Sequence, residues 1–344
     1  MTNPEKNINI KQFPRKILPM GSMTYNERIK IDMPLPKIIM CPYIFEAAQI
    51  LIYAVTGAGK SMIATTIGLG IAGCKSIFGG KWTVPNGSRK VIYFDGEMLP
   101  SVYRDRETQL LKGHKFEIFD DENWKVYHAI NSERFNLFHI EGQNIFWEQI
   151  DINSPEVIIL DNLNVLYRPK ISGNLRESWD PMQKILFQLK RENIAVIIIS
   201  HAGKSGSELG SSGHTMDMDV VLKLYPTINE NNKYEMTVKM ACEKGRMFGN
   251  ENKKPFTLNL EKIHFEGEEK SDYGLIWRPD EKENLKSRRE IAEELLRDRE
   301  MTYGNIQKET GYSLGQISKI NKALGLQANR KPGPRPEKET IGVK

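Results

Sequence analysis

The stretch AVTGAGKSM, residues 54–62, follows the apolar run QILIY and precedes the helical pattern IATTIGLGIA. It matches the phosphate-binding signature G-x-x-x-x-G-K-[ST] except at the first position, where Ala54 replaces glycine. The flanking runs predict a strand, a glycine-rich loop and a helix, which is the setting that the signature requires. The alternative is a glycine-rich turn that only resembles the signature. We interpret the stretch as a nucleotide site, because the first glycine mainly permits a tight turn and alanine fits there if its φ is negative.

In a loop of this kind, successive backbone N–H groups and a helix N-terminus surround the phosphates of a nucleotide. Lys60 is placed to reach the outer phosphates of ATP, and the Ser61 hydroxyl is placed to hold Mg²⁺. The predicted nucleotide-binding residues are Thr56, Gly57, Ala58, Gly59, Lys60, Ser61 and Met62.

Carboxylates at the ends of two apolar runs are predicted to complete the site. Asp161 closes EVIILD, where it would hold Mg²⁺ together with Ser61, and the alternative is a strand-terminating Asp in a turn. Glu97 follows VIYFDG and is our first choice for the base that activates the attacking water, with Asp95 as the competing residue.

A further apolar run, IAVIIIS, ends at His201. Ligands of open parallel sheets bind beyond the carboxyl ends of the strands, so either Ser200 or His201 could contact the γ-phosphate. We favour His201 as a sensor of hydrolysis, although an isolated histidine is more often structural.

The alternation of apolar runs and helical stretches along the chain predicts the fold class. Over residues 39–266, uninterrupted apolar runs alternate with helical stretches, which is typical of an α/β protein whose parallel sheet is covered on both faces. The later runs DVVLKLYP, YEMTVKMA, PFTLNL and EKIHFE predict antiparallel strands on one edge. Residues 1–38 are expected to form an extended arm and residues 267–286, which have no periodic apolar face, a linker.

Three short helical patterns over residues 287–326 predict a small all-α helix-turn-helix domain, followed by a basic disordered tail over residues 327–344. From Ser287 onward there are 12 Lys or Arg against 8 Asp or Glu, which indicates a nucleic-acid partner, although a solvated basic tail is the alternative. The third helix begins with the capping box SLGQ. Its predicted contacts to double-stranded DNA are Ser313, Gln316, Lys319 and Lys322, and the alternative is a small bundle for oligomerisation.

Composition indicates a soluble globular protein. The chain has 344 residues, of which 39% are hydrophobic and 27% are charged, and no apolar run approaches the roughly 18 residues that span a bilayer. The polar start lacks the apolar stretch of a signal peptide. We therefore expect a cytoplasmic protein with no membrane partner. Its three cysteines have no metal-binding or disulfide spacing.

The segments GAGKS, VIYFDGEM, VIILDNL, IIISHAGK and GSSGHTMDMDVVLKL occur in this order and resemble the RepA-like hexameric replicative helicases, which are RecA-type P-loop ring ATPases. The resemblance covers about residues 35–265. It implies a RecA-like core, a homo-oligomer that is a hexameric ring, ATP bound between subunits and single-stranded DNA in the central channel. By position, it implies phosphate and Mg²⁺ ligands at Lys60 and Ser61, a catalytic base at Glu97, the Walker B acid at Asp161 and a sensor at His201. Ala54 and the single histidine of SHAG depart from the family pattern.

Two further elements fit a ring. The segment EKGRMFG, residues 243–249, resembles the finger that ring helicases project into a neighbour's ATP site, which implies catalytic roles for Lys244 and Arg246; the alternative is a solvated basic hairpin end. The loops YRPKISGN and AGKSGSELGSSG carry Arg168, Lys170 and Lys204, which would follow a single-stranded DNA backbone, or the loops are ordinary connectors.

The sequence thus predicts an ATP-dependent DNA helicase or translocase that acts in replication of a plasmid, phage or other mobile element. One alternative is an ATP-dependent DNA-binding switch without unwinding activity, such as a helicase loader, a recombination protein or a regulator. A second is a non-enzymatic DNA-binding repressor, which the intact Lys60, Glu97 and Asp161 disfavour.

Overall fold

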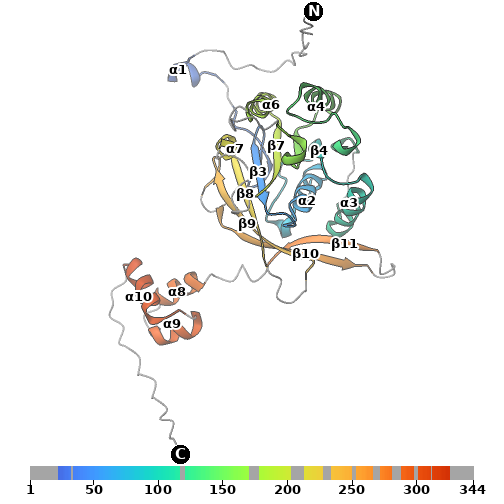
Figure 1. Ribbon diagram of the computed structural model, residues 1–344. Coiled ribbons are helices and arrows are strands. Elements are labelled where there is room, and N and C mark those ends of the chain that lie inside the picture. Colours follow the sequence, from blue (N-terminus) through green and yellow to red (C-terminus); the bar gives the residue numbers. More distant parts are fainter. Residues whose placement is uncertain are drawn as a thin grey trace, which may run out of the picture. The chain divides into compact units, whose positions relative to one another are not determined.

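The computed structural model describes residues 22–31, 34–116, 121–169, 178–202, 213–227, 234–249, 253–265, 272–280, 288–297, 301–310 and 312–325. The chain divides into two compact units, residues 1–279 and 280–344. The first unit is an α/β domain and the second is helical (Figure 1).

One sheet of nine strands organises the described part of the first unit, in the order β11-β10-β9-β8-β3-β7-β6-β4-β5. Its strands are β3 (Gln49–Ala54), β4 (Val91–Asp95), β5 (Trp124–His128), β6 (Val157–Asp161), β7 (Ala195–His201), β8 (Val220–Pro226), β9 (Met236–Gly245), β10 (Phe256–His264) and β11 (Tyr273–Pro279). The six strands from β8 to β5 are parallel, and β9, β10 and β11 extend the sheet in antiparallel fashion. A short hairpin of β1 (Ile38–Met40) and β2 (Ile44–Phe45) precedes the sheet.

Helices cover both faces of the parallel strands (Figure 1). The helices of this unit are α1 (Tyr25–Arg28), α2 (Lys60–Ala72), α3 (Pro100–His114), α4 (Ile140–Asn153), α5 (Leu163–Leu166), α6 (Asp180–Arg191) and α7 (Gly213–Asp217), with short 3₁₀ turns at Phe78–Gly80, Asp121–Asn123 and Ala129–Asn131. Alternate residues of β3 enter different cores: Ile50 and Ile52 pack with α2 and α3, whereas Leu51 and Tyr53 pack with α4 and α6. The predicted α/β fold class with a doubly covered parallel sheet is confirmed.

Helix α2 is buried at every position except Ser61. In Figure 1, β10 and β11 cross beneath α2 and α3. Gly113 of α3 and Gly274 of β11 allow this contact, because a Cβ at Gly113 would lie 2.1 Å from the backbone oxygen of Leu275. The backbone N–H of Trp277 also donates to Nε2 of His114 at 3.1 Å, which ties the last strand to α3.

Three local predictions need correction. The expected linker over residues 267–286 contains β11, whose seven residues pair with the neighbouring strand β10 and which packs against α3, about 160 residues earlier in the chain. The expected extended arm over residues 1–38 contains the helical turn α1, which Thr24 and Glu27 close with a capping box. The run DVVLKLYP, expected to be antiparallel, forms β8, which is parallel to β3 and antiparallel only to β9.

The second unit contains α8 (Arg288–Arg297), α9 (Tyr303–Thr310) and α10 (Leu314–Ala323). Ala292, Leu296, Ile306 and Ile317 form its buried core. Residues 311–313 connect α9 to α10, so the last two helices have the short connection of a helix-turn-helix. The predicted capping box at the start of α10 is confirmed, because Ser313 and Gln316 exchange both hydrogen bonds.

Among the described residues, no helix is long and apolar enough to cross a membrane. The predicted basic tail over residues 327–344, most of the expected arm, and the two ends of the expected linker lie outside the described residues.

Candidate nucleotide site and basic elements

The phosphate loop joins the central strand β3 to α2. Gly57 and Gly59 have φ of 80° and 74°, a conformation that favours glycine, and Gly59 is the N-cap of α2. Ala54 is the last residue of β3, where it pairs with His201 of β7 and its backbone is that of a strand. The backbone at the first signature position therefore does not require glycine, and alanine fits there.

Lys60 is almost fully buried at the start of α2. Its Nζ donates to the backbone oxygens of Ala54 at 3.0 Å and Val55 at 2.9 Å, so the ammonium group closes the loop onto itself. Burial lowers the pKa of Lys60, and the nearby charges of Asp161 and Glu97 oppose this shift. A phosphate oxygen would be a better partner than these carbonyls, because it carries charge.

Asp161 ends β6 and is 3% exposed. The Tyr93 hydroxyl donates to its carboxylate, and Ser61 forms a further hydrogen bond with it. Burial raises the pKa of Asp161 above its ordinary value, although both hydrogen bonds act in the opposite direction. A buried carboxylate next to the Ser61 hydroxyl is an oxygen donor set that suits Mg²⁺.

The two carboxylates at the end of β4, Asp95 and Glu97, have different surroundings. Asp95 is 1% exposed, and its side chain accepts from the backbone N–H groups of Glu97 and Met98 and lies 3.0 Å from Nδ1 of His128. Its oxygens are thus occupied in shaping the turn. The Glu97 side chain, by contrast, is 48% exposed and faces His201 across 3.7 Å.

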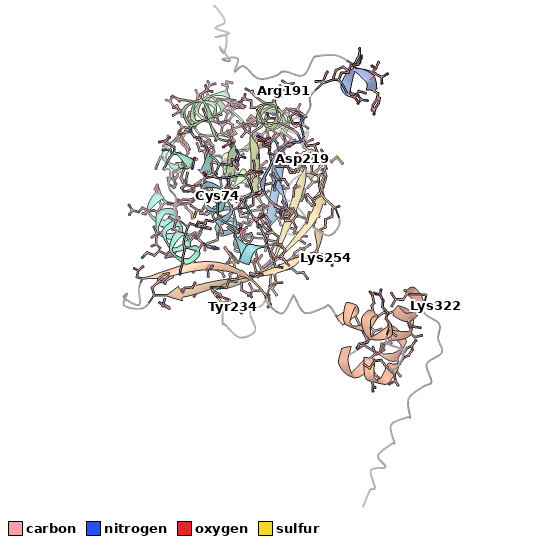
Figure 2. All side chains as sticks on the ribbon, turned by 180° about the vertical axis from the view of Figure 1, so that it is seen from behind. Cys74, Arg191, Asp219, Tyr234, Lys254 and Lys322 are labelled. Carbon is pink, nitrogen blue, oxygen red and sulfur yellow. The ribbon has the colours of Figure 1, made fainter. Side chains whose placement is uncertain are left out.

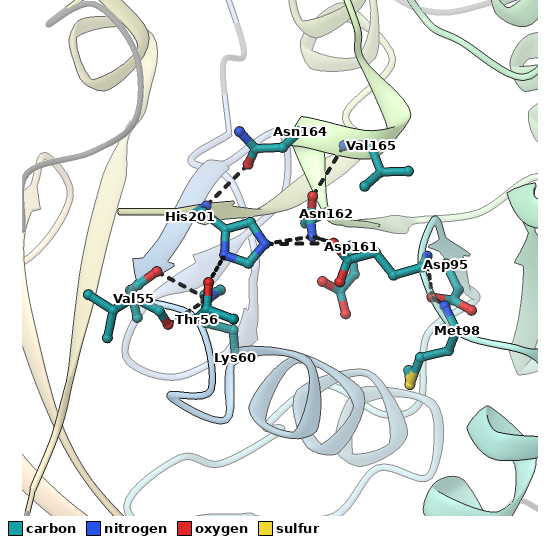
Figure 3. A network of polar contacts seen from close by, with 12 residues as sticks. Val55, Thr56, Lys60, Asp95, Met98, Asp161, Asn162, Asn164, Val165 and His201 are labelled. Atoms are coloured by element: carbon teal, nitrogen blue, oxygen red, sulfur yellow. Dashed lines mark hydrogen bonds and ion pairs between the residues drawn. The ribbon is translucent and has the colours of Figure 1, made fainter. Parts of the chain in front are cut away.

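His201 lies at the carboxyl end of β7, between Thr56 of the phosphate loop and Asn162 (Figure 3). Its Nδ1 is 3.4 Å from Oγ1 of Thr56, and its Nε2 is 3.1 Å from Nδ2 of Asn162. Nδ2 of Asn162 also donates to Oε1 of Glu97 at 2.6 Å. Asn162 was not among the predicted site residues, although its position directly after Asp161 at a strand end was a usable signal.

These residues form one cluster at the carboxyl ends of β3, β4, β6 and β7. The open loop of positive-φ glycines, the buried Lys60 and the Ser61–Asp161 contact fit a nucleotide with Mg²⁺. In that arrangement Thr56, Gly57, Ala58, Gly59, Lys60, Ser61 and Met62 would surround the phosphates, and Ser61 and Asp161 would hold the metal, which supplies charge neutralisation at the phosphates.

Lys244 and Arg246 lie at the opposite end of the same sheet. Gly245 pairs with Val220, which pairs with Ile50, so this point is about 13 Å along the strand direction from Ala54. Nζ of Lys244 donates to the backbone oxygens of Thr215 and Met216, in α7, and Arg246 donates to Met216 and to Asp219. The pair is therefore separated from the phosphate loop of its own chain.

The predicted single-stranded DNA contacts are only partly described. Arg168 is exposed after α5, and its backbone N–H and oxygen both bond to the side chain of Asn136. Lys170 and Lys204 lie outside the described residues.

In the second unit, Ser313, Gln316, Lys319 and Lys322 are exposed on α10. Figure 2 shows Lys322 on the outside of this unit. The amide oxygen of Gln316 accepts from the backbone N–H and the hydroxyl of Ser313, so this oxygen serves the helix cap. Lys319 and Lys322 are three residues apart and share a face of the helix.

A protein-family model described as an AAA domain matches residues 23–207, more than half of the chain. The chain belongs to the AAA domain family. The stretch that matches the AAA domain contains the phosphate loop, Glu97, Asp161 and His201. Members with this P-loop fold are ATPases that use ATP and Mg²⁺.

A second family model, described as Trp repressor protein, matches residues 255–331, which include β10 and β11 as well as the three helices of the second unit. Among solved structures, a KaiC-like protein from Pyrococcus horikoshii has a TM-score of 0.46 and 12% identity, over 64% of this chain and 89% of that chain. No curated protein gave a significant match. The chain thus combines a P-loop ATPase domain of the AAA domain family with a helix-turn-helix unit.

Proposed function

We propose that this protein is an ATP-dependent DNA helicase or translocase of the RepA-like kind, which works as a homo-oligomeric ring in the replication of a plasmid, phage or other mobile element. The observation that carries this proposal is the division of the catalytic set between two ends of one sheet. Lys60, Glu97, Asp161 and His201 lie at the carboxyl ends of the parallel strands, whereas Lys244 and Arg246 lie at the other end.

Hydrolysis in this scheme needs two subunits. Lys60 of one subunit binds the outer phosphates, and Glu97 takes a proton from the attacking water. Arg246 of the neighbouring subunit enters the same site and neutralises the charge that develops on the γ-phosphate. Its present partners, the Met216 carbonyl and the Asp219 carboxylate 3.5 Å away, hold it at the surface with about half of its side chain exposed.

DNA contacts complete the proposal. Arg168, Lys170 and Lys204 would follow the backbone of single-stranded DNA in the ring channel. The exposed face of α10, with Lys319 and Lys322, would bind double-stranded DNA at a recruitment site, while Ser313 and Gln316 would contact it at the N-terminus of that helix.

The first experiment measures ATP turnover with and without single-stranded DNA, together with strand displacement on a forked duplex. The proposal predicts turnover that single-stranded DNA stimulates and unwinding that needs hydrolysable ATP. Turnover and DNA binding without displacement on any fork polarity would support the DNA-binding switch instead. If no ATP turnover is measured under any of these conditions, the non-enzymatic DNA-binding repressor becomes the favoured function.

A second experiment separates the two units. A chain that ends at Asp280 keeps β11 and should retain DNA-stimulated ATPase activity, but it should lose the site-specific part of duplex binding. Equal affinity of the full and shortened chains for every duplex, over a range of salt concentrations, would contradict the role of α10.

A further inference from the structure

Asn162 connects residues that are proposed to hydrolyse ATP, but no role was predicted for it. It is 2% exposed and directly follows Asp161. It is also the N-cap of α5, because its Oδ1 accepts from the backbone N–H of Val165 at 3.2 Å (Figure 3). A backbone N–H can only donate, so this contact assigns Oδ1 to the cap and leaves the amide nitrogen for the site.

Both hydrogens of that nitrogen have partners in the site. One is directed to Oε1 of Glu97 at 2.6 Å and the other to Nε2 of His201 at 3.1 Å. The bond to Glu97 is charge-assisted and short, so it holds a long side chain that is otherwise half exposed. Oε2 of Glu97 has no partner among the described residues and is the oxygen available to a water molecule.

The same amide decides where the proton of His201 resides. Because Nδ2 of Asn162 can only donate, Nε2 of His201 must accept, and a neutral ring then carries its proton on Nδ1. That Nδ1–H points to Oγ1 of Thr56 in the phosphate loop, 3.4 Å away. The hydrogen bonds thus run from the phosphate loop through His201 and Asn162 to Glu97.

We propose that Asn162 is a positioning residue for ATP hydrolysis, which orients the carboxylate of Glu97 and keeps the proton of His201 on Nδ1. This inference rests on the proposed hydrolysis of ATP at this site but not on the helicase activity. In this role the amide nitrogen of Asn162 contacts neither nucleotide nor water, because Glu97 and His201 use both of its hydrogens.

The first test uses Asn162→Asp, which has the same shape and remains a good N-cap for α5 but cannot donate. Its kcat for ATP should fall by about tenfold to a hundredfold, while its KM and the Kd for a fluorescent ATP analogue stay within about twofold of the wild type. Asn123→Asp is the matched control, because Asn123 bonds only to the exposed Ser88 at 3.3 Å among the described residues. Asn162→Ser also keeps a capping side chain and should show the same loss.

A double-mutant cycle shows whether Asn162 acts through Glu97. In a Glu97→Gln background, Asn162→Asp should lower the residual rate by less than about twofold. A kcat of Asn162→Asp equal to that of the wild type, or an equal fractional loss in both backgrounds, would overturn the proposal. If the wild type itself does not hydrolyse ATP, the proposed function fails first.

The tautomer of His201 gives a test without activity. The chain has six histidines, and the His201 signals in a ¹⁵N-histidine spectrum can be assigned by comparison with His201→Gln. The nucleotide-free wild type should show the Nδ1–H tautomer, and Asn162→Asp, which presents an acceptor, should move the proton to Nε2. An Nε2–H tautomer in the wild type would contradict the proposed role.

Discussion

The parallel and antiparallel halves of the sheet differ in what they bury. At the carboxyl end of the parallel half, Lys60 and Asp161 are almost fully buried, and burial disfavours the charged form of each. The antiparallel half instead buries Leu275 and Trp277 against α3, with two glycines at the closest contact. The site is thus held in place at an electrostatic cost, while the antiparallel half is held to α3 by apolar packing.

The largest effect should come from the parallel half. Glu97→Gln removes the proposed base and should lower kcat by about 10²- to 10⁴-fold with ATP binding kept, as measured by steady-state hydrolysis and by binding of a fluorescent analogue. Asp95→Asn should instead mainly destabilise the fold, because Asp95 supports the turn and contacts His128. If the Glu97→Gln protein hydrolyses ATP at the wild-type rate, another residue must be the base.

The antiparallel half is tested by Gly113→Ala. The new methyl group would lie 2.1 Å from the backbone oxygen of Leu275, so β11 must move away from α3, and the free energy of unfolding should fall by about 3 kcal/mol. Gly315→Ala is the control, since nothing lies within 4 Å of that position. Denaturant unfolding measures both, and equal midpoints would mean that β11 does not need this close contact.

His114 makes the antiparallel half sensitive to acid. Burial, assisted by the charge of Arg278, lowers the pKa of His114 to about 4, and the neutral ring accepts from the Trp277 N–H. Between about pH 6.5 and pH 4, His114 binds a proton in the unfolded chain but stays neutral in the folded chain. The contribution of His114 to stability is therefore complete above this pH range and is lost as the pH decreases through it. We expect a loss on the order of 2 kcal/mol across the window, which His114→Gln should reduce.

Urea unfolding at a series of pH values measures this loss, and Gln can accept the Trp277 N–H in place of histidine. His139→Gln is the control for replacing a histidine. If wild type and His114→Gln lose stability in parallel between pH 6.5 and pH 4, the buried imidazole is not the cause.

The smallest expected change is one of stability in the parallel half. Asp161→Asn should abolish hydrolysis but raise the melting temperature of the nucleotide-free protein at neutral pH by roughly 2 °C, because an ionised carboxylate is no longer buried. The raised pKa of Asp161 means that the penalty is absent below the unfolded-state pKa and grows as the pH rises through the folded-state pKa. The gain should therefore shrink as the pH decreases. An equal or lower melting temperature for Asp161→Asn at pH 8 would contradict this account.

The sequence predicted the elements whose signals are local. The strand, loop and helix around Lys60 and the carboxylate at the end of β6 needed only apolar runs and their end residues. The strand β11 was missed because its stability comes from α3, about 160 residues earlier, and from a contact between two glycines that no periodicity reveals. Asn162 was missed because a residue that caps a helix and also orients a base has the same sequence signal as an ordinary cap.

A mixture of two inactive subunits tests the central claim that each ATP site is shared by neighbouring chains. Arg246→Ala keeps an intact phosphate loop, and Lys60→Ala keeps an intact finger, so each variant alone should lack ATPase activity. When they are mixed, interfaces that pair the loop of the first with the finger of the second should restore part of the activity, in proportion to the fraction of such interfaces. Sizing and a labelled-subunit assay establish that both variants assemble and exchange. Activity that stays at background at every mixing ratio, in rings shown to contain both subunits, would contradict the shared site.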